Sequence, residues 1–199
     1  MYLVCGLGNH GEKYKQTRHN VGFMALDYWW QQSDILIGQD LKKDKKKKSI
    51  WGKAAFCDQE YIVCFPQTFM NLSGQAVRAL AYYYKIKPEQ IIIMHDDLDL
   101  PTGKIRIKSG GGTGGHKGVE SVIAHLDTPD FLRIRIGIGQ ADWFSGDLAS
   151  KESLDMSTYV LEKIPPAEKR LIDKAIEQIP KIIASIDEAG IQQTMNQYN

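Results

Sequence analysis

Histidine, aspartate and asparagine side chains recur where predicted strands end and predicted helices begin. These residues are Asn9, His19, Asn20, Asn71, the triplet His95-Asp96-Asp97, and His116. Ligands of open α/β sheets bind beyond the carboxyl ends of the strands, so we expect these side chains to converge on one cleft. Their chemistry is proton transfer and hydrogen bonding.

A carboxylate that follows a buried strand is well placed to orient a histidine, and Asp96 comes shortly after the apolar run Ile91-Ile92-Ile93-Met94. A histidine titrates near neutral pH. A paired carboxylate fixes its tautomer and stabilises its charged form, so the pair meets the needs of a general base. The amides of Asn9 and Asn71 can hold a carbonyl or a water without adding charge. No serine or cysteine sits in a Gly-x-Ser-x-Gly elbow, which favours direct attack by an activated water.

Each of these residues also has a simpler interpretation. Asn20 and Asn71 could cap the helices that they open, and for Asn20 we expect that role. His95 could be a hydrogen-bonded core residue. The rival chemical interpretation is a metal hydrolase that uses His19, His95, Asp96 and His116. It is the weaker one because local ligand spacing such as His-x-Glu or Cys-x-x-Cys is missing, and we expect no bound metal.

A glycine-rich loop connects a basic strand with a helix. Alternation in Lys104-Ile105-Arg106-Ile107-Lys108 is typical of a half-buried strand, and apolar residues recur at helical spacing from Val119 to Leu126. Between them lies Gly110-Gly111-Gly112-Thr113-Gly114-Gly115-His116-Lys117-Gly118. Glycines let a ligand approach the backbone, and bare amides at the positive end of a helix dipole suit an anion or a polarised oxygen. We therefore predict a ligand loop with His116 at or near the helix N-terminus.

A second glycine motif, Gly6-Leu7-Gly8-Asn9-His10-Gly11, matches the dinucleotide fingerprint letter for letter. In that fold the helix starts within the motif, whereas apolar periodicity here resumes only at Val21. No acidic residue ends a second strand about 20 residues further on, where the ribose contact is expected. We set a nicotinamide enzyme aside, expect no cofactor, and interpret the glycines as a sharp turn that presents Asn9.

Strands interleaved with helices predict a single-domain α/β sandwich with a mixed, mostly parallel twisted sheet flanked by helices. Strands are expected near residues 2–5, 54–57, 61–65, 90–94, 104–108 and 131–138, and helices near 21–32 and 72–84. A last helix is expected to begin at Pro166 and to stop at Gly190. The 199 residues suffice for one well-buried domain, which we place at residues 1–190, with a polar tail at 191–199.

The composition is that of an ordinary globular protein, with 43% hydrophobic and 25% charged residues. Since the net charge is only +1, a nucleic acid would have to be met by a local basic patch. The three cysteines sit in apolar segments without metal-ligand spacing, as in a reducing compartment. No stretch is long or apolar enough for a membrane span, and we expect a cytoplasmic protein.

Two polar segments lack periodicity. Residues 38–50 contain the run Lys42-Lys43-Asp44-Lys45-Lys46-Lys47-Lys48, which we interpret as a solvated loop, with a phosphate-facing loop as the alternative. Residues 140–153 carry Gly, Ser, Asp and Trp, a composition that is typical of a mobile flap.

Five ordered motifs carry a resemblance to a known family. The first two are Gly6-Leu7-Gly8-Asn9-x-Gly11-x-x-Tyr14-x-x-Thr17-Arg18-His19-Asn20-x-Gly22 and Pro66-x-Thr68-Phe69-Met70-Asn71-x-Ser73-Gly74. The next two are His95-Asp96-Asp97-Leu98-Asp99-Leu100-Pro101-x-Gly103 and Gly110-Gly111-Gly112-x-Gly114-Gly115-His116-x-Gly118. The last is Phe131-x-Arg133-x-Arg135-Ile136-Gly137-Ile138-Gly139. In this order they are similar to the motifs of bacterial peptidyl-tRNA hydrolases, from residue 3 to about residue 185.

The resemblance implies a monomeric cytoplasmic esterase that cleaves the bond between a peptide's C-terminal carbonyl and the 3′-terminal ribose of tRNA. It implies His19 as the catalytic base, Asp96 as the residue that orients it, and Asn71 as a further catalytic residue. The cleft for peptide and ester is expected to include Asn9, Tyr14, Phe69, Met70, Asn71, His116 and Lys117. Lys108 and Arg135 are expected to clamp the 5′-phosphate of the tRNA, a contact that positions a nucleic acid without reading its sequence.

The chain departs from the family pattern at two positions. His10 stands where proline is usual, a change at a turn that we expect to be tolerated. Lys117 stands where asparagine is usual, beside the loop histidine. That amide helps to order water and substrate in the family, whereas a lysine could meet the phosphates of the CCA end as a flexible point charge, or point to solvent.

A non-enzymatic alternative also follows from the resemblance, because plant chloroplasts contain close relatives that act in intron splicing. The presence of His19, Asp96 and Asn71 argues against a catalytically silent RNA-binding module.

Overall fold

The computed structural model of the chain describes residues 1–32, 40–140, 143 and 155–199. Within them a seven-stranded sheet has the order β2-β3-β4-β1-β5-β7-β6. The strands are β1 (Tyr2–Gly6), β2 (Lys42–Asp44), β3 (Ser49–Phe56), β4 (Gln59–Pro66), β5 (Ile91–Pro101), β6 (Ile105–Ser109) and β7 (Leu132–Gly139). The four central strands run parallel, and β2, β3 and β6 pair antiparallel at the two sides. The predicted α/β fold with a mixed, mostly parallel sheet is confirmed.

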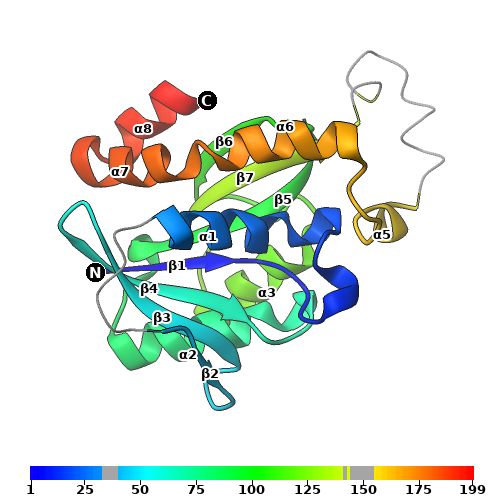
Figure 1. Cartoon of the computed structure of the whole chain (residues 1–199). Coiled ribbons are helices and arrows are strands. Elements are labelled where there is room, and N and C mark those ends of the chain that lie inside the picture. Colours follow the sequence, from blue (N-terminus) through cyan, green and yellow to red (C-terminus); the bar gives the residue numbers. More distant parts are fainter. Residues whose placement is uncertain (33–39, 141–142, 144–154) are drawn as a thin grey trace.

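Helices cover both faces of this sheet (Figure 1). One face packs against α2 (Ser73–Tyr84) and α3 (Lys117–Leu126), and the other against α1 (Val21–Gln32), α6 (Pro166–Ile176) and α7 (Ile179–Ala189). Leu3 and Cys5 of β1 belong to the first core and Val4 to the second, as expected for a strand buried on both faces. Short helical turns complete the chain: η1 (Glu12–Tyr14), η2 (Arg18–Asn20), η3 (Met70–Leu72), η4 (Pro88–Gln90) and α5 (Met156–Tyr159).

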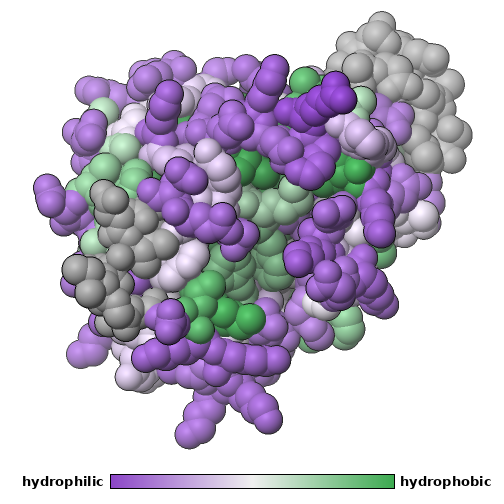
Figure 2. All heavy atoms as spheres, in the orientation of Figure 1, coloured by the Kyte–Doolittle hydropathy of each residue, from purple (hydrophilic) through white to green (hydrophobic). Residues whose placement is uncertain are grey.

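The lysine-rich segment, expected to be an irregular loop, is a β-hairpin. β2 pairs antiparallel with β3, and Asp44 lies opposite Ser49. The Asp44 carboxylate accepts the backbone N–H groups of Lys46 and Lys47 at 2.8 and 3.0 Å, and Lys48 has the left-handed conformation (φ 50°). An aspartate that bonds to the backbone two residues on forms a turn without leaving any periodicity in the sequence. In the lower part of Figure 2, where this hairpin lies in Figure 1, hydrophilic side chains protrude.

The long helix expected from Pro166 to Gly190 is two helices. α6 begins at Pro166 as predicted, and α7 ends at Ala189, directly before Gly190. Pro180 lies in the first turn of α7, where the N–H that proline lacks is not needed and where a preceding helix cannot continue.

Residues 191–199, expected to be a polar tail, form α8 (Ile191–Tyr198), which packs against α7 and β6. The Asn199 side chain accepts the N–H of Ile107 at 2.7 Å and donates to the Ile107 carbonyl at 3.0 Å. The segment therefore belongs to the folded domain and covers part of the edge strand β6.

The first turn of α1 lies directly on the backbone of the sheet. A Cβ atom at Gly22 would lie 2.4 Å from the carbonyl oxygen of Met94 and 2.6 Å from that of Leu7, and one at Gly6 would lie 2.3 Å from the carbonyl oxygen of Gly22. Only glycine permits this approach. Backbone contact, together with the buried Val21 side chain, thus holds the start of α1, and the preceding His19, against β1 and β5.

Among the described residues, no helix is both long and apolar enough to cross a membrane. The flap expected at residues 140–153 lies outside the described residues, apart from Gln140 and Trp143.

Candidate active site

A cavity of about 640 Å³ opens where the segment before α1, the glycine loop and α5 meet. At the right of Figure 1, α5 lies beside the segment that precedes α1. The two are joined there by a hydrogen bond from the His19 N–H to the carbonyl of Val160 at 2.8 Å. The cavity is lined by residues of six segments: Asn9, His19, Phe69–Asn71, Asp96–Leu98, Thr113–Lys117 and Met156–Leu161 without Tyr159. Asn9, His19, Asn71, Asp96, Asp97 and His116 therefore converge on this cavity as predicted, whereas Asn20 and His95 do not line it.

His19 and Asp96 form a hydrogen-bonded pair at this cavity. Nδ1 of His19 lies 2.9 Å from one Asp96 carboxylate oxygen and 3.0 Å from the other. Asp96 is 2% exposed, and the His19 side chain 12%. Because a carboxylate can only accept, Nδ1 carries the proton and Nε2 carries the lone pair. The pair fixes the tautomer that a general base needs.

His116 is the N-cap of α3, and its tautomer is fixed as well. Nδ1 accepts the backbone N–H groups of Gly118 and Val119 at 3.1 and 3.2 Å. Nε2 lies 2.8 Å from Oδ1 of Asp96, so it carries the proton and donates it. The prediction that His116 begins the helix is confirmed. The expected anion site of bare amides is corrected, because the imidazole already caps two of them.

His95 was expected to follow the strand, but it lies within β5 and packs against His116. β5 continues to Pro101 because it pairs with β7 through Asp97 and again at Pro101. Nδ1 of His95 donates to the backbone carbonyl of Asp96 at 2.7 Å, and its ring lies edge-on to that of His116 at 4.8 Å. Burial, reinforced by His116, lowers the pKa of His95 to about 3, so this histidine is neutral.

The electrostatics favour a charged carboxylate beside a base that titrates above its ordinary range. Burial raises the pKa of the Asp96 carboxyl, but the two histidines bonded to it prevail and hold that pKa well below its usual value. Burial lowers the pKa of His19, but the charge and hydrogen bond of Asp96 prevail and raise it. The ammonium group of Lys117 acts in the opposite direction and lowers the pKa of His19.

A chain of amide hydrogen bonds orients Asn9. The Asn20 side chain accepts the N–H of Asn9 at 2.8 Å and donates to the Asn9 carbonyl at 3.0 Å. Oδ1 of Asn9 accepts the N–H of Met70 at 2.8 Å, so the Asn9 NH₂ group is the donor left for the cavity. The N-cap role expected for Asn20 is corrected: its side chain holds the turn that presents Asn9.

The remaining predicted cleft residues divide into two groups. Phe69, Met70, Asn71 and Lys117 line the cavity, with Phe69 packed at 5.4 Å on the ring of His10. Tyr14 does not line it; its ring lies under the ammonium group of Lys13.

The two predicted phosphate ligands lie on neighbouring strands beside the glycine loop. The Lys108 side chain lies against Gly111 of the loop, where an added Cβ atom would lie 2.6 Å from the Lys108 ammonium nitrogen. Arg135 forms an ion pair with Asp97, which itself lines the cavity. Arg133, to which we assigned no role from sequence, lies between them on the sheet and donates to the carbonyls of Gly112 and Gly111 at 2.6 and 2.7 Å. Its buried guanidinium holds the glycine loop, a function that alternation in a strand cannot reveal.

Arg18 is the second residue whose role sequence reasoning missed. Its side chain is 3% exposed and forms ion pairs with Glu162 and Glu168, each at 2.9 Å. It also donates to the carbonyl of Tyr159 and lies 4.0 Å over its ring. Arg18 thus joins the turn that carries His19 to the segment around α5, which lines the cavity. Only the distant glutamates make this role visible.

One group of described residues offers metal-ligand atoms within 4.8 Å of one another: His19, Asp96 and His116. Nδ1 of His19 and Nε2 of His116 donate to the Asp96 carboxylate, and Nδ1 of His116 accepts hydrogen bonds from two backbone N–H groups. A metal ion would have to displace these hydrogen bonds, so the donor set fits a proton-transfer site better than a metal site.

The fold and the site together define an α/β protein with a hydrogen-bonded histidine–aspartate pair at a cavity. A family model described as "Peptidyl-tRNA hydrolase" matches residues 3–199. The chain is 41% identical to the peptidyl-tRNA hydrolase of Caldanaerobacter subterraneus over the full length of both, and 42% identical to that of Lactobacillus gasseri, again over both full lengths. The crystal structure of peptidyl-tRNA hydrolase from Acinetobacter baumannii, 38% identical, covers all of this chain and 94% of its own, with a TM-score of 0.86. The chain belongs to the peptidyl-tRNA hydrolase family.

Proposed function

We propose that this chain hydrolyses the ester bond between the C-terminal carbonyl of a peptide and the 3′-terminal ribose of tRNA, releasing the peptide and free tRNA. Membership of the family supports the reaction and the substrate. The observation that carries the mechanism is the double hydrogen bonding of Asp96 by His19 and His116, which leaves Nε2 of His19 unprotonated at the cavity.

The reaction uses His19 first as a base and then as an acid. Nε2 takes a proton from water while the water oxygen forms a bond to the ester carbonyl carbon. The bond between that carbon and the ribose oxygen then breaks, and the imidazolium returns the proton to the leaving oxygen. Asp96 stabilises the imidazolium between the two steps, which its low pKa permits because it stays ionised.

Two side-chain amides donate hydrogen bonds to the carbonyl oxygen of the substrate ester. The NH₂ group of Asn9 is directed to the cavity by the bonds that occupy its other atoms, and Asn71 lies exposed at the cavity wall. Donors of this kind stabilise the negative charge that develops on the oxygen in the transition state. Phe69 and Met70 supply an apolar wall for the peptide beside them.

The tRNA enters with its CCA end at His19 and its acceptor stem over β6 and β7. Lys108 and Arg135 meet the 5′-phosphate there; Asp97 holds the Arg135 guanidinium in place until the phosphate arrives. The protein acts as a monomer without a cofactor. The free cysteines Cys5, Cys57 and Cys64 are in keeping with action in the cytoplasm.

Single-turnover hydrolysis of a labelled peptidyl-tRNA tests the proposal. His19→Ala should lower the rate by about 10²–10⁴, the usual contribution of a positioned base, and leave tRNA affinity nearly unchanged because the phosphate contacts are made by other residues. A variant that retains near-normal single-turnover rates would remove His19 from the base role.

The same assay separates the two alternative functions. A metal hydrolase would lose activity on exhaustive chelation and regain it with zinc, whereas the proposed site needs only the magnesium that folds the tRNA. A silent RNA-binding relative would bind the substrate and release no peptide.

A further inference from the structure

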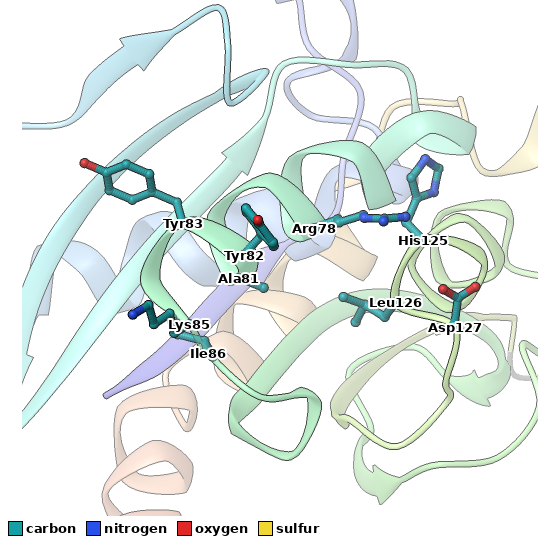
Figure 3. A pocket seen from close by; sticks show the side chains of 9 residues that line it. All are labelled: Arg78, Ala81, Tyr82, Tyr83, Lys85, Ile86, His125, Leu126 and Asp127. Carbon is teal, nitrogen blue, oxygen red and sulfur yellow. The ribbon is translucent and has the colours of Figure 1, made fainter.

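A second surface, remote from the catalytic cavity, combines cations with exposed aromatic rings. A cavity of about 640 Å³ opens between the C-terminal ends of α2 and α3 (Figure 3). The catalytic cavity lies at the opposite ends of the same helices, where Asn71 precedes α2 and His116 precedes α3. At 1.5 Å per residue, the 12 residues of α2 span about 18 Å, and the remote cavity is lined from Arg78 onward in its second half.

The lining of this remote cavity has an apolar part and a basic part. Ala81, Ile86 and Leu126 supply the apolar side chains. Arg78 and Lys85 supply two cations, and in Figure 3 the Arg78 side chain extends from α2 toward His125 of α3. The one carboxylate in the lining, Asp127, comes directly after the end of α3. An apolar pocket between cations suits a flat ligand that carries negative charge on one side.

Two tyrosines stand beside this pocket with little cover. Tyr82 is 86% exposed and Tyr83 is 64% exposed. Both rings lie beside the apolar side chains of the same pocket, and contiguous exposed apolar surface of this kind marks binding sites. The rings continue across the molecule: Tyr83 lies 4.8 Å from Tyr84, and Tyr84 lies 5.6 Å from Trp51 of β3.

The lysine hairpin of β2 and β3 extends the basic surface from this row of rings. The ammonium group of Lys47 lies 4.4 Å from the centre of the Tyr83 ring and 5.1 Å from that of Trp51. Lys53 lies 5.5 Å over Tyr84. Asp44 pairs with Lys47, so the free charge of the hairpin comes from its exposed lysines, Lys42, Lys43, Lys45, Lys46 and Lys48.

We propose that this surface, which comprises the remote cavity, the tyrosines of α2 and the lysine hairpin, binds single-stranded RNA. An unpaired base occupies the apolar pocket and stacks on Tyr82 or Tyr83. The phosphates lie along Arg78, Lys85 and the hairpin, away from Asp127. Cations interleaved with exposed aromatic rings are the chemistry by which proteins hold unpaired nucleic acid, because every base has a face to stack and every nucleotide a charge. A duplex hides those faces, so it fits this surface less well.

This binding does not depend on His19, on the catalytic cavity or on the phosphate clamp. It gives the lysine run a partner that the proposed hydrolysis does not supply.

Fluorescence anisotropy with a labelled oligouridine of twelve nucleotides tests the proposal, since oligouridine has no structure of its own. The double variant Tyr82→Ala/Tyr83→Ala should weaken binding about tenfold or more, because stacked bases lose their platform. Arg78→Gln/Lys85→Gln should reduce the log–log salt slope by about 0.7 for each phosphate that is no longer neutralised by a cation. Lys174→Gln/Lys181→Gln, which removes two exposed charges on the opposite face of the sheet, is the matched control and should bind like the parent.

The test is completed by a duplex RNA of the same length and by hydrolysis rates of the same variants. Weaker duplex binding, with unchanged hydrolysis in the tyrosine variant, supports a separate single-strand site. No binding of oligouridine at low salt would overturn the proposal. So would equal binding by the tyrosine variant and the parent, since the oligonucleotide would then be held elsewhere or by charge alone. Failure of hydrolysis in His19→Ala bears only on the catalytic proposal.

Discussion

Asp96→Asn should inactivate the site by changing a tautomer while every side chain stays in place. The asparagine side chain offers one acceptor oxygen and one NH₂ donor to two imidazoles that both need an acceptor. His116 cannot adapt, because its other nitrogen already accepts the N–H groups of Gly118 and Val119. It therefore takes the oxygen, and the NH₂ group faces Nδ1 of His19. The NH₂ group takes the place of Oδ2, 2.9 Å from Nδ1 of His19, and its hydrogens repel a proton on Nδ1 although the shared oxygen lies only 3.0 Å away. We therefore expect His19 to accept at Nδ1 and to carry its proton on Nε2, where the base should have a lone pair.

The expected loss in kcat/KM is about 10⁴-fold, which corresponds to about 5.4 kcal/mol of transition-state stabilisation at 1.36 kcal/mol per factor of ten. The analogous change in a serine-protease triad, which also leaves the geometry intact and imposes the wrong tautomer, has this size. Hydrolysis of labelled peptidyl-tRNA measures the rate, and ¹⁵N NMR of the imidazoles reports the tautomer. Asp96→Asn should leave the fold and tRNA affinity nearly unchanged.

A second substitution distinguishes this reasoning from a loss of charge. His116→Ala alone should lower activity, because His116 lines the cavity and donates to Asp96. The double variant Asp96→Asn/His116→Ala should be as active as Asp96→Asn alone or more active, since the asparagine can then turn its oxygen to His19. The tautomer argument would be refuted if the activity losses of the two single variants multiplied in the double variant. It would also be refuted if Asp96→Asn kept activity within a few fold of the parent.

Three further outcomes follow from the same geometry. Lys117→Ala should move the acidic limb of the pH profile of kcat/KM to higher pH, because the Lys117 ammonium group lowers the pKa of His19. Lys117→Arg keeps the charge and should leave that limb in place. If the limb does not move in Lys117→Ala either, Lys117 has no part in setting the pKa of His19. Lys108→Ala should raise KM and lower the log–log salt slope by roughly one unit on tRNA with a 5′-phosphate. Arg135→Ala should act likewise, although it also frees Asp97; equal losses on tRNA without that phosphate would rule out the clamp. Arg18→Met should lower both kcat and the free energy of unfolding, the latter by about 2 kcal/mol because Glu168 and the carbonyl of Tyr159 lose a charged hydrogen-bond donor. A urea midpoint within error of the parent would contradict the link between the His19 turn and the α5 segment.

Short apolar runs made the parallel core of the fold predictable. The strands around residues 2–5, 61–65 and 91–94 are buried on both faces, so their sequences are nearly continuous in apolar residues. The approach of His19 to Asp96 also followed, because the segment after β1 and the segment around Asp96 belong to neighbouring parallel strands. His116 reaches Asp96 by another route, since its loop follows the antiparallel strand β6.

Other features depend on contacts that leave no pattern. The turn at Asp44 forms because one carboxylate captures two backbone amides, so a run that reads as solvated becomes a hairpin. The tautomer of His116 depends on two amide groups of its own helix, and the anchoring of the glycine loop depends on Arg133, which is distant in the chain. Asn20 illustrates the limit clearly, since its type suits a helix cap equally well.

The close approach of Gly6 and Gly22 has a consequence for how such an enzyme can diverge. Core side chains change volume as sequences drift, and helices that rest on side chains shift with them. Here the first turn of α1, directly after the turn that carries His19, also rests on the carbonyl groups of Leu7 and Met94, a contact that involves no side chain. The separation of imidazole and carboxylate is therefore insulated from that drift. A single methyl group at Gly22 would remove that insulation.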